Sequence, residues 1–271
     1  MWEGTGSEAI ASTLLKELES SKTTWLLVAF TALTIVLSLM LRLYRDYQGF
    51  ISLGPGGTPP TLAGFLRVEL LSLFALRNPY EPAPTPERFK DQPGYLLDLA
   101  KRQPPRPVTR GIAPHRQITM KASKADFDKL ADAIKAIGKA NDDLLIGTSC
   151  FEKHGTGLFS LSPAKSTCKG EICHAHPSDG SMHLTLHPAD VKTVLEAGWG
   201  ERHPIARGGW FERFVPSGFL MVYAPRDAGE VEILLKIVRA AAWFVSGGDG
   251  VKEGVDERRD SGYVSAEEAD Q

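Results

Sequence analysis

Six of the seven histidines of this chain lie between positions 154 and 203. Two of them, His174 and His176, form a His-x-His pair, and His183 follows shortly after. Neutral imidazoles can act as general bases and hydrogen-bond donors, because the ordinary pKa of histidine lies near neutral pH. Three imidazoles can also bind a zinc, iron or copper ion and leave positions open for a ligand. A third interpretation is a polar surface without chemistry.

A β-hairpin is predicted to bring these three histidines together. Polar and apolar residues alternate on both sides of Pro177-Ser178-Asp179-Gly180, which has the composition of a hairpin turn. If the turn has an even number of residues, His174 lies opposite His183, and His176 shares their face; an odd turn would break this register. We expect the histidine face to be open to solvent. The opposite face is predicted to be a core layer of Cys173, Ala175, Met182, Leu184 and Leu186.

A second block carries residues suited to a flat, anionic substrate. Between Gly198 and Pro204, Trp199 offers a ring that can stack on a planar molecule, and Arg202 and His203 can stabilise an anion. A purely structural loop with a packed tryptophan is an equally good interpretation. Further substrate-binding candidates beside predicted strands are Glu152, His154, Tyr223 and Arg226.

The elements around these residues predict an α+β fold, with a small antiparallel or mixed sheet packed against helices. Apolar residues recur at helical spacing over 124–139, and Asp227 with Glu230 forms a capping box at the start of a last helix. A strand is predicted over 219–223. We place the boundaries of this domain at 85–246.

The region before the domain contains one candidate transmembrane helix, 23–44. Its uncharged run from Trp25 to Leu41 would be ~26 Å long as a helix, close to the thickness of a bilayer core. A buried core helix is the alternative, and a signal peptide is disfavoured because no charged n-region precedes the run. Equal numbers of basic residues flank it, so the positive-inside rule gives no orientation. The remaining segments are a tail, 1–22, a linker, 45–84, with an amphipathic or interfacial helix over 62–76, and a disordered acidic tail, 247–271.

Composition excludes several functional classes. The formal net charge is −2, whereas a dedicated nucleic-acid-binding protein needs a basic excess. The chain has no Gly-x-Gly-x-x-Gly, Walker or Gly-x-Ser-x-Gly motif, so no nicotinamide, flavin or nucleotide site and no serine hydrolase is predicted. Three cysteines provide no disulfide framework, which favours a reducing compartment.

Several motifs together resemble a known family. They occur in order over about residues 44–246 and include Tyr44-Arg45-Asp46-Tyr47-Gln48-Gly49-Phe50, Ser149-x-Phe151-Glu152-x-His154, Glu171-Ile172-x-His174-x-His176 and Gly198-Trp199-Gly200-x-Arg202-His203-Pro204. With these motifs the chain resembles the fungal luciferase family, membrane-bound enzymes that oxidise 3-hydroxyhispidin. Two departures are the turn after His176, where luminous members have a further histidine, and the first 43 residues, which match only in being apolar.

The resemblance implies an oxygenase that combines O2 with a hydroxylated α-pyrone or similar planar polyphenol, without an organic cofactor, and opens the ring with loss of carbon dioxide. In this interpretation one of the three hairpin histidines removes the enolic proton, Arg202 and His203 stabilise the anion, and Trp199 stacks on the substrate. One alternative is a metal-dependent oxygenase in which the same three histidines bind iron, copper or zinc. Another is a membrane-tethered, non-catalytic module that binds a phenolic small molecule.

We expect the protein to be a single-pass membrane protein of the endoplasmic reticulum, with the domain facing the cytosol. The cysteines, the absence of glycosylation sequons and the resemblance favour this location.

Overall fold

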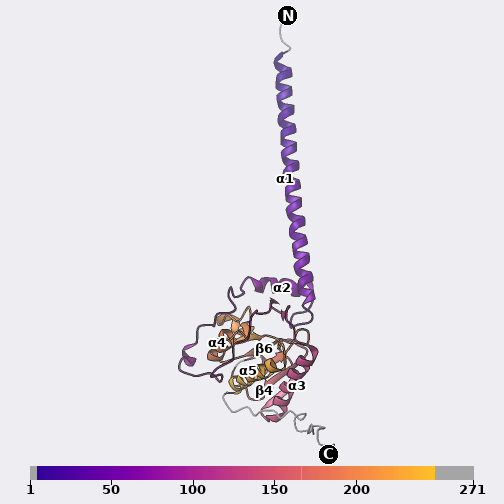
Figure 1. Ribbon diagram of the computed structural model, residues 1–271. Coiled ribbons are helices and arrows are strands. Elements are labelled where there is room, and N and C mark those ends of the chain that lie inside the picture. The colour runs from indigo at the N-terminus through magenta and orange to yellow at the C-terminus, as the bar shows by residue number, and fades with distance from the viewer. Residues whose placement is uncertain (1–4, 166, 248–271) are drawn as a thin grey trace, which may run out of the picture. The chain divides into compact units, whose positions relative to one another are not determined.

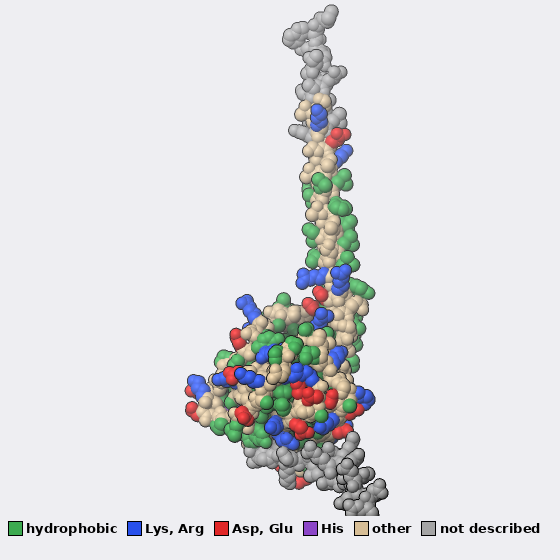
Figure 2. Space-filling view, in the orientation of Figure 1, with side chains coloured by type: hydrophobic (Ala, Val, Ile, Leu, Met, Phe, Trp, Pro, Cys, Tyr) green, Lys and Arg blue, Asp and Glu red, His purple; other side chains and the backbone are tan. Residues whose placement is uncertain are grey.

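The N-terminal part of the chain is one long helix. The computed structural model describes residues 5–165 and 167–247, and the chain divides into two units after Ser52. Helix α1 (Thr5–Ser52) forms the first unit and contains a stretch, Glu19–Ser52, that is long and apolar enough to cross a membrane. Exposed apolar side chains cover the middle of this stretch, and basic side chains lie before and after them along the helix (Figure 2). The predicted span 23–44 and most of the predicted tail thus belong to one helix, consistent with a single-pass anchor or a signal sequence.

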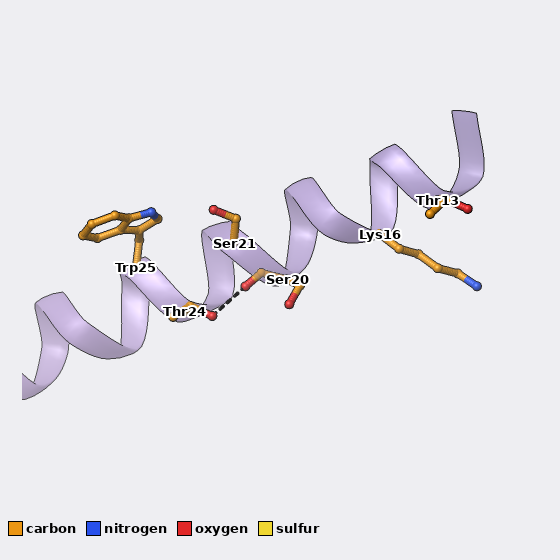
Figure 3. A pocket seen from close by; sticks show the side chains of 6 residues that line it. All are labelled: Thr13, Lys16, Ser20, Ser21, Thr24 and Trp25. Atoms are coloured by element: carbon orange, nitrogen blue, oxygen red, sulfur yellow. Dashed lines mark hydrogen bonds between the residues drawn. The ribbon is translucent and has the colours of Figure 1, made fainter. Parts of the chain in front are cut away.

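A shallow hollow on α1 is shown in Figure 3. It is lined by Thr13, Lys16, Ser20, Ser21, Thr24 and Trp25. All six side chains leave the same helix, and Thr24 donates a hydrogen bond to the carbonyl of Ser20 within it. The hollow therefore has the character of a helix surface and holds none of the candidate residues.

The second unit is built on a six-stranded antiparallel sheet with the order β3-β4-β5-β6-β8-β7. The strands are β3 (Leu144–Thr148), β4 (Thr156–Ser160), β5 (Glu171–Ala175), β6 (Met182–Thr185), β7 (Gly200–Arg202) and β8 (Phe219–Val222). A separate two-stranded hairpin consists of β1 (Thr109–Gly111) and β2 (His115–Gln117). The predicted α+β fold with an antiparallel sheet is confirmed.

Helices cover one face of the sheet. Helices α3 (Lys124–Ala140) and α5 (Ala228–Ser246) pack against each other and against the sheet (Figure 1). Side chains cap both helices, since Ser123 accepts a hydrogen bond from the Asp126 amide and Asp227 accepts one from the Glu230 amide. The predicted helix over 62–76 is the shorter α2 (Leu62–Ser72). The remaining helical elements are α4 (Pro188–Glu196) and the 3₁₀ turns η1 (Glu87–Phe89), η2 (Cys168–Gly170) and η3 (Gly209–Arg213).

The β5–β6 hairpin has the predicted register. His174 pairs with His183, Cys173 with Leu184 and Ala175 with Met182. The face that carries Cys173, Met182 and Leu184 is fully buried in the core beneath α3 and α5, as predicted.

The histidine face is buried as well, so the expectation of a solvent-exposed face is wrong. His174, His176 and His183 are only 3%, 1% and 3% exposed. The β1–β2 hairpin covers them, because His115 contacts His183 and the Gln117 amide donates to Asp179 in the β5–β6 turn. The interpretation of these histidines as a solvated polar surface is therefore excluded.

The cysteine interpretation also needs correction. Cys150 and Cys168 form a disulfide with a Cα–Cα distance of 5.9 Å, and Cys173 is free and buried. The bridge joins the loop after β3 to the turn that leads into β5, two segments that no sequence spacing identifies as neighbours. The predicted acidic tail, 247–271, lies outside the described residues apart from Gly247, which ends α5.

Candidate active site

Five buried histidines form a connected cluster on the covered face of the sheet. His183 lies at its centre: its Nδ1 is 3.3 Å from Nε2 of His174 and 3.1 Å from Nε2 of His176. On its other side, His183 Nε2 is 3.2 Å from Nδ1 of His115. The ring of His203 is 5.4 Å from that of His183 and 5.3 Å from that of His115. Antiparallel strands and the β1–β2 hairpin therefore bring together residues more than 80 positions apart.

Carboxylates and hydroxyl groups hold the outer nitrogens of these rings. His174 Nδ1 lies 2.7 Å from Oε1 of Glu171, a carboxylate that is 1% exposed. His176 Nδ1 lies 2.9 Å from Oγ of Ser181, which in turn donates to Oδ1 of Asp179 at 2.8 Å. Because an ionised carboxylate only accepts hydrogen bonds, both Nδ1 atoms carry the proton and both Nε2 atoms present a lone pair to the cluster.

A carboxylate holds His115, and two backbone groups hold His203. His115 Nε2 is 3.3 Å from Oε1 of Glu201, which also accepts hydrogen bonds from Thr109 and Tyr223. His203 donates from Nε2 to the carbonyl of Ile112 at 2.9 Å, and its Nδ1 accepts from the Ile205 amide at 3.4 Å. His203 therefore has both ring nitrogens occupied within the protein.

An ion pair and two aromatic rings complete the walls of the cluster. Arg116 binds Glu152 through two hydrogen bonds of 3.0 and 2.6 Å. Glu152 Oε1 lies 3.8 Å from His176 Nε2 and 4.0 Å from His174 Nε2, so this carboxylate borders the cluster. Phe219 stacks on His183 with a centroid distance of 5.1 Å, and Phe151 packs on Phe219 at 4.6 Å. A planar, electron-rich molecule would meet both rings and imidazoles here.

Burial keeps the central histidines neutral at physiological pH. Burial lowers the pKa of His176 to about 4, although the hydrogen bond toward Asp179 opposes this shift. Burial and the neighbouring histidines lower the pKa of His183 and of His203 well below the ordinary value. For Glu152 burial acts to raise the pKa, but the hydrogen bond and the positive charge of Arg116 outweigh it and lower the pKa. Neutral imidazoles beside a carboxylate anion can accept a proton or bind a cation.

These shifts predict how stability depends on pH. In the unfolded chain His176 and His183 take up protons as the pH falls below about 6.5, whereas in the folded protein their lowered pKa values delay protonation until the pH is far lower. The contribution of these histidines to the free energy of unfolding is therefore complete above about pH 6.5 and is lost as the pH falls toward about 4. Urea unfolding at several pH values measures this, and a His183→Gln variant should show a weaker dependence. A urea midpoint that stays constant through this range would contradict the assignment.

The predicted site residues divide into two groups. His174, His176, His183 and His203 come together in the cluster, Glu152 borders it, and Tyr223 reaches it through Glu201. The other four candidates do not contact the histidines of the cluster through any described interaction. Trp199 packs in the helix-covered core and donates to the carbonyl of Ala100, and Arg202 donates to the carbonyls of Glu81 and Ala206. Arg226 pairs with Glu230, and His154, with its side chain 40% exposed, pairs with the outer side of Glu152.

Sequence reasoning missed several members of the cluster. His115 and Arg116 lie on β2, a three-residue strand too short to show a periodic pattern. In the sequence, Glu171 stands out only as part of the motif that contains His174, and Asp179 stands out only as a turn residue. Glu201 directly precedes Arg202, and the alternation of side chains along β7 would have placed these two neighbours on opposite faces.

The fold and site define an α+β protein with a buried cluster of histidines and carboxylates between a sheet and a covering hairpin. Residues 169–241 match the Luciferase domain family, a segment that contains His174, His176, His183 and His203. The luciferase of Neonothopanus nambi is 31% identical over 221 residues, covering 74% of this chain and 80% of that protein. The luciferases of Armillaria ostoyae and Armillaria mellea are each 32% identical over 219 residues, with coverage of 74% and 81%. The chain belongs to the fungal luciferase family. No solved structure matches it significantly.

Proposed function

We propose that this protein is an oxygenase that combines O2 with a hydroxylated α-pyrone or a similar planar polyphenol and uses no organic cofactor. The observation that carries the proposal is the convergence of unprotonated imidazole nitrogens in a buried cluster. Family membership supports a small-molecule substrate and oxidative chemistry.

The cluster suits the formation and protection of an electron-rich anion. When the enolic hydroxyl group of such a substrate loses its proton, the ring carbon can donate electrons to O2 and form a carbon–oxygen bond, giving a peroxide. The histidine nitrogens receive the proton, and Arg116 lies beside the cluster as a fixed positive charge. We assign to Arg116 the anion-stabilising role expected for Arg202, because Arg116 pairs with Glu152 at the border of the cluster, whereas Arg202 donates to backbone carbonyls away from it. Phe219 and Phe151 replace Trp199 as the stacking surface.

The covered cluster must open before a substrate can reach it. The segments over it are the β1–β2 hairpin, the loop that carries Phe151 and Glu152, and residues near Pro55, whose carbonyl accepts a hydrogen bond from Arg116. All three lie outside the six-stranded sheet and the helices packed on it, which suits a movable cover.

Oxygen consumption by the purified full-length chain in detergent tests the proposal. We expect uptake of O2 that depends on 3-hydroxyhispidin or simpler hydroxypyrones and is lost in a Glu152→Gln, His183→Gln double variant. A non-catalytic binding module is the competing candidate. It would bind the same compounds, detectable by quenching of tryptophan fluorescence, without any O2 uptake, and that result would overturn the proposal.

The disulfide changes the expected membrane orientation. The expectation of a cytosolic domain rests on the cysteines, the absence of glycosylation sequons and the resemblance. The first of these grounds does not hold, because Cys150 and Cys168 are paired and disulfides persist in oxidising compartments. We therefore propose a protein of the endoplasmic reticulum membrane with the domain on the luminal side. In sealed microsomes, residues 53–247 should resist added protease until detergent is present. Digestion without detergent would place the domain in the cytosol.

A further inference from the structure

The hydrogen bonds around His183 cannot all be satisfied when the histidines of the cluster are neutral. The Nδ1 protons of His174 and His176 are committed to Glu171 and Ser181. Their Nε2 lone pairs therefore both point at Nδ1 of His183, at 3.3 and 3.1 Å. A neutral His183 carries one proton, on Nδ1 or on Nε2. Neither position satisfies all the neighbouring nitrogen and oxygen atoms.

Each neutral arrangement leaves at least two acceptors in contact. If the His183 proton is on Nδ1, its Nε2 lone pair faces Nδ1 of His115 at 3.2 Å. Moving the His115 proton to Nδ1 repairs that contact but turns the Nε2 lone pair of His115 toward the Glu201 carboxylate at 3.3 Å. If instead the His183 proton is on Nε2, it donates to His115, and His115 donates to Glu201, but three lone pairs then meet between His174, His176 and His183.

From this arrangement we propose that His174 Nε2, His176 Nε2 and His183 Nδ1 bind one divalent first-row transition-metal ion. A cation at this position takes the three facing lone pairs as ligands. The His183 proton is then on Nε2 and is donated to His115, and His115 in turn donates to Glu201.

The inference rests on the proposed function and changes one step of it. With the ion bound, the three ligand lone pairs no longer accept the enolic proton, and the Glu152 carboxylate beside His176 is the base that receives it. Binding itself is measured without substrate.

The distances agree with coordination. Metal–imidazole bonds of ~2.0–2.1 Å at tetrahedral angles place two ligand nitrogens ~3.3 Å apart, and the two His183 contacts are 3.1 and 3.3 Å. The three ligand atoms all lie within 4.8 Å of one another. Imidazole sites suit iron, copper, nickel and zinc rather than calcium or magnesium.

The surroundings of the three rings also resemble those of metal-binding histidines. Such histidines generally donate their second nitrogen to a carboxylate or another acceptor, which fixes the ring and its tautomer. Glu171 serves His174 directly, and Asp179 serves His176 through Ser181. The Glu152 carboxylate lies 3.8 Å from His176 Nε2, where its negative charge favours a cation.

A second group of three histidines, His115, His183 and His203, is also close enough to share an ion. This group is less suitable, because His203 donates from Nε2 to Ile112 and accepts at Nδ1 from Ile205. Binding an ion there would break the hydrogen bonds of His203 to the backbone, whereas an ion at His174, His176 and His183 replaces only the contacts among these three rings.

Elemental analysis of the full-length chain in detergent tests the site. The wild type, loaded with Fe²⁺, Cu²⁺ or Zn²⁺ and then desalted, should retain ~1 ion per chain of at least one of these metals, and Co²⁺ should give the visible absorption bands of a nitrogen-ligated ion. His174→Ala and His176→Ala should each lose the retained ion and the bands. His187→Asn, which replaces a histidine that caps α4 outside the cluster, should keep both.

Two further outcomes keep the test decisive. His115→Gln removes a cluster histidine outside the proposed ligand set and should retain the ion. If His115→Gln loses the ion while His174→Ala retains it, the ion belongs to the other group of histidines and the proposal is overturned.

Circular dichroism identifies variants that fail to fold. If the alanine variants fail to fold, Ser181→Ala replaces them in the test: it removes the support of His176 and should weaken Co²⁺ binding by ~10-fold or more. A folded wild type that holds none of these ions overturns the proposal. O2 uptake that survives chelation would then leave the proposed function standing, whereas a bound ion without O2 uptake would overturn the function alone.

Discussion

Replacing His183 by alanine is expected to lower the rate of substrate-dependent O2 uptake by ~10²-fold or more. His183 contacts His115, His174 and His176, so its loss disconnects the cluster in addition to removing one imidazole. Because the ring is 3% exposed and stacked on Phe219, we also expect a stability loss of about 1–3 kcal/mol, more than a surface position would show. Initial rates per folded molecule and urea unfolding measure the two effects.

His187 provides the matched control for this variant. It lies in the same stretch of sequence and is buried, but its ring contacts Phe89 and Phe244, and its Nδ1 accepts a hydrogen bond from the Ala189 amide. Asparagine is a favoured residue at a helix N-cap, so His187→Asn should keep both the helix and the rate. Equal losses of rate in His183→Ala and His187→Asn would show that general destabilisation, rather than the cluster, explains the effect.

Leu184→Ala is expected to have the opposite effect. Leu184 follows His183 on β6 but points into the core, where it is fully buried. Truncation there removes buried methyl groups and leaves a cavity, at a cost of about 2–5 kcal/mol. The rate per folded molecule should be unchanged, since the side chain does not face the histidines. Urea unfolding combined with O2 uptake at low denaturant measures both quantities.

Leu145 is a suitable comparison for Leu184. It lies on β3 with 50% exposure, so Leu145→Ala should change the free energy of unfolding by no more than about 0.5 kcal/mol. A Leu184→Ala variant as stable as Leu145→Ala, or one that is stable but inactive, would contradict the division of β6 into a core face and a histidine face.

The hairpin could be predicted because its information is local. Alternation along β5 and β6 and a turn with an even number of residues determine which side chains share a face, and the observed register agrees with this reasoning. Capping residues such as Ser123 and Asp227 likewise mark the starts of α3 and α5. The same local reasoning located His174, His176 and His183 without any knowledge of the rest of the fold.

The remainder of the site depends on contacts between distant segments. His115 and Arg116 reach the cluster because β1–β2 folds over the sheet, and no pattern in a three-residue strand indicates what it will cover. The burial of the histidine face has the same origin. The Cys150–Cys168 bridge also depends on a long-range approach, so counting cysteines gave the wrong interpretation.

Residue type alone was a poor guide in the block from Gly198 to Pro204. Trp199 and Arg202 have side chains suited to a flat anion, but alternation along β7 points only Glu201 toward the histidines. Arg202 binds backbone carbonyls and Trp199 fills the core. In the proposed function the roles expected of them pass to Arg116, Phe151 and Phe219, which are contributed by other segments.

The central claim is that O2 itself reacts at the histidine cluster, and the most direct measurement is the fate of heavy-oxygen-labelled O2. The purified full-length chain is incubated with labelled O2 and a hydroxylated α-pyrone, and the product is analysed by mass spectrometry. We predict that the product carries oxygen from O2, and that His183→Ala abolishes this incorporation while His187→Asn does not. A product labelled only from heavy-oxygen water, or incorporation that persists in His183→Ala, would contradict the account.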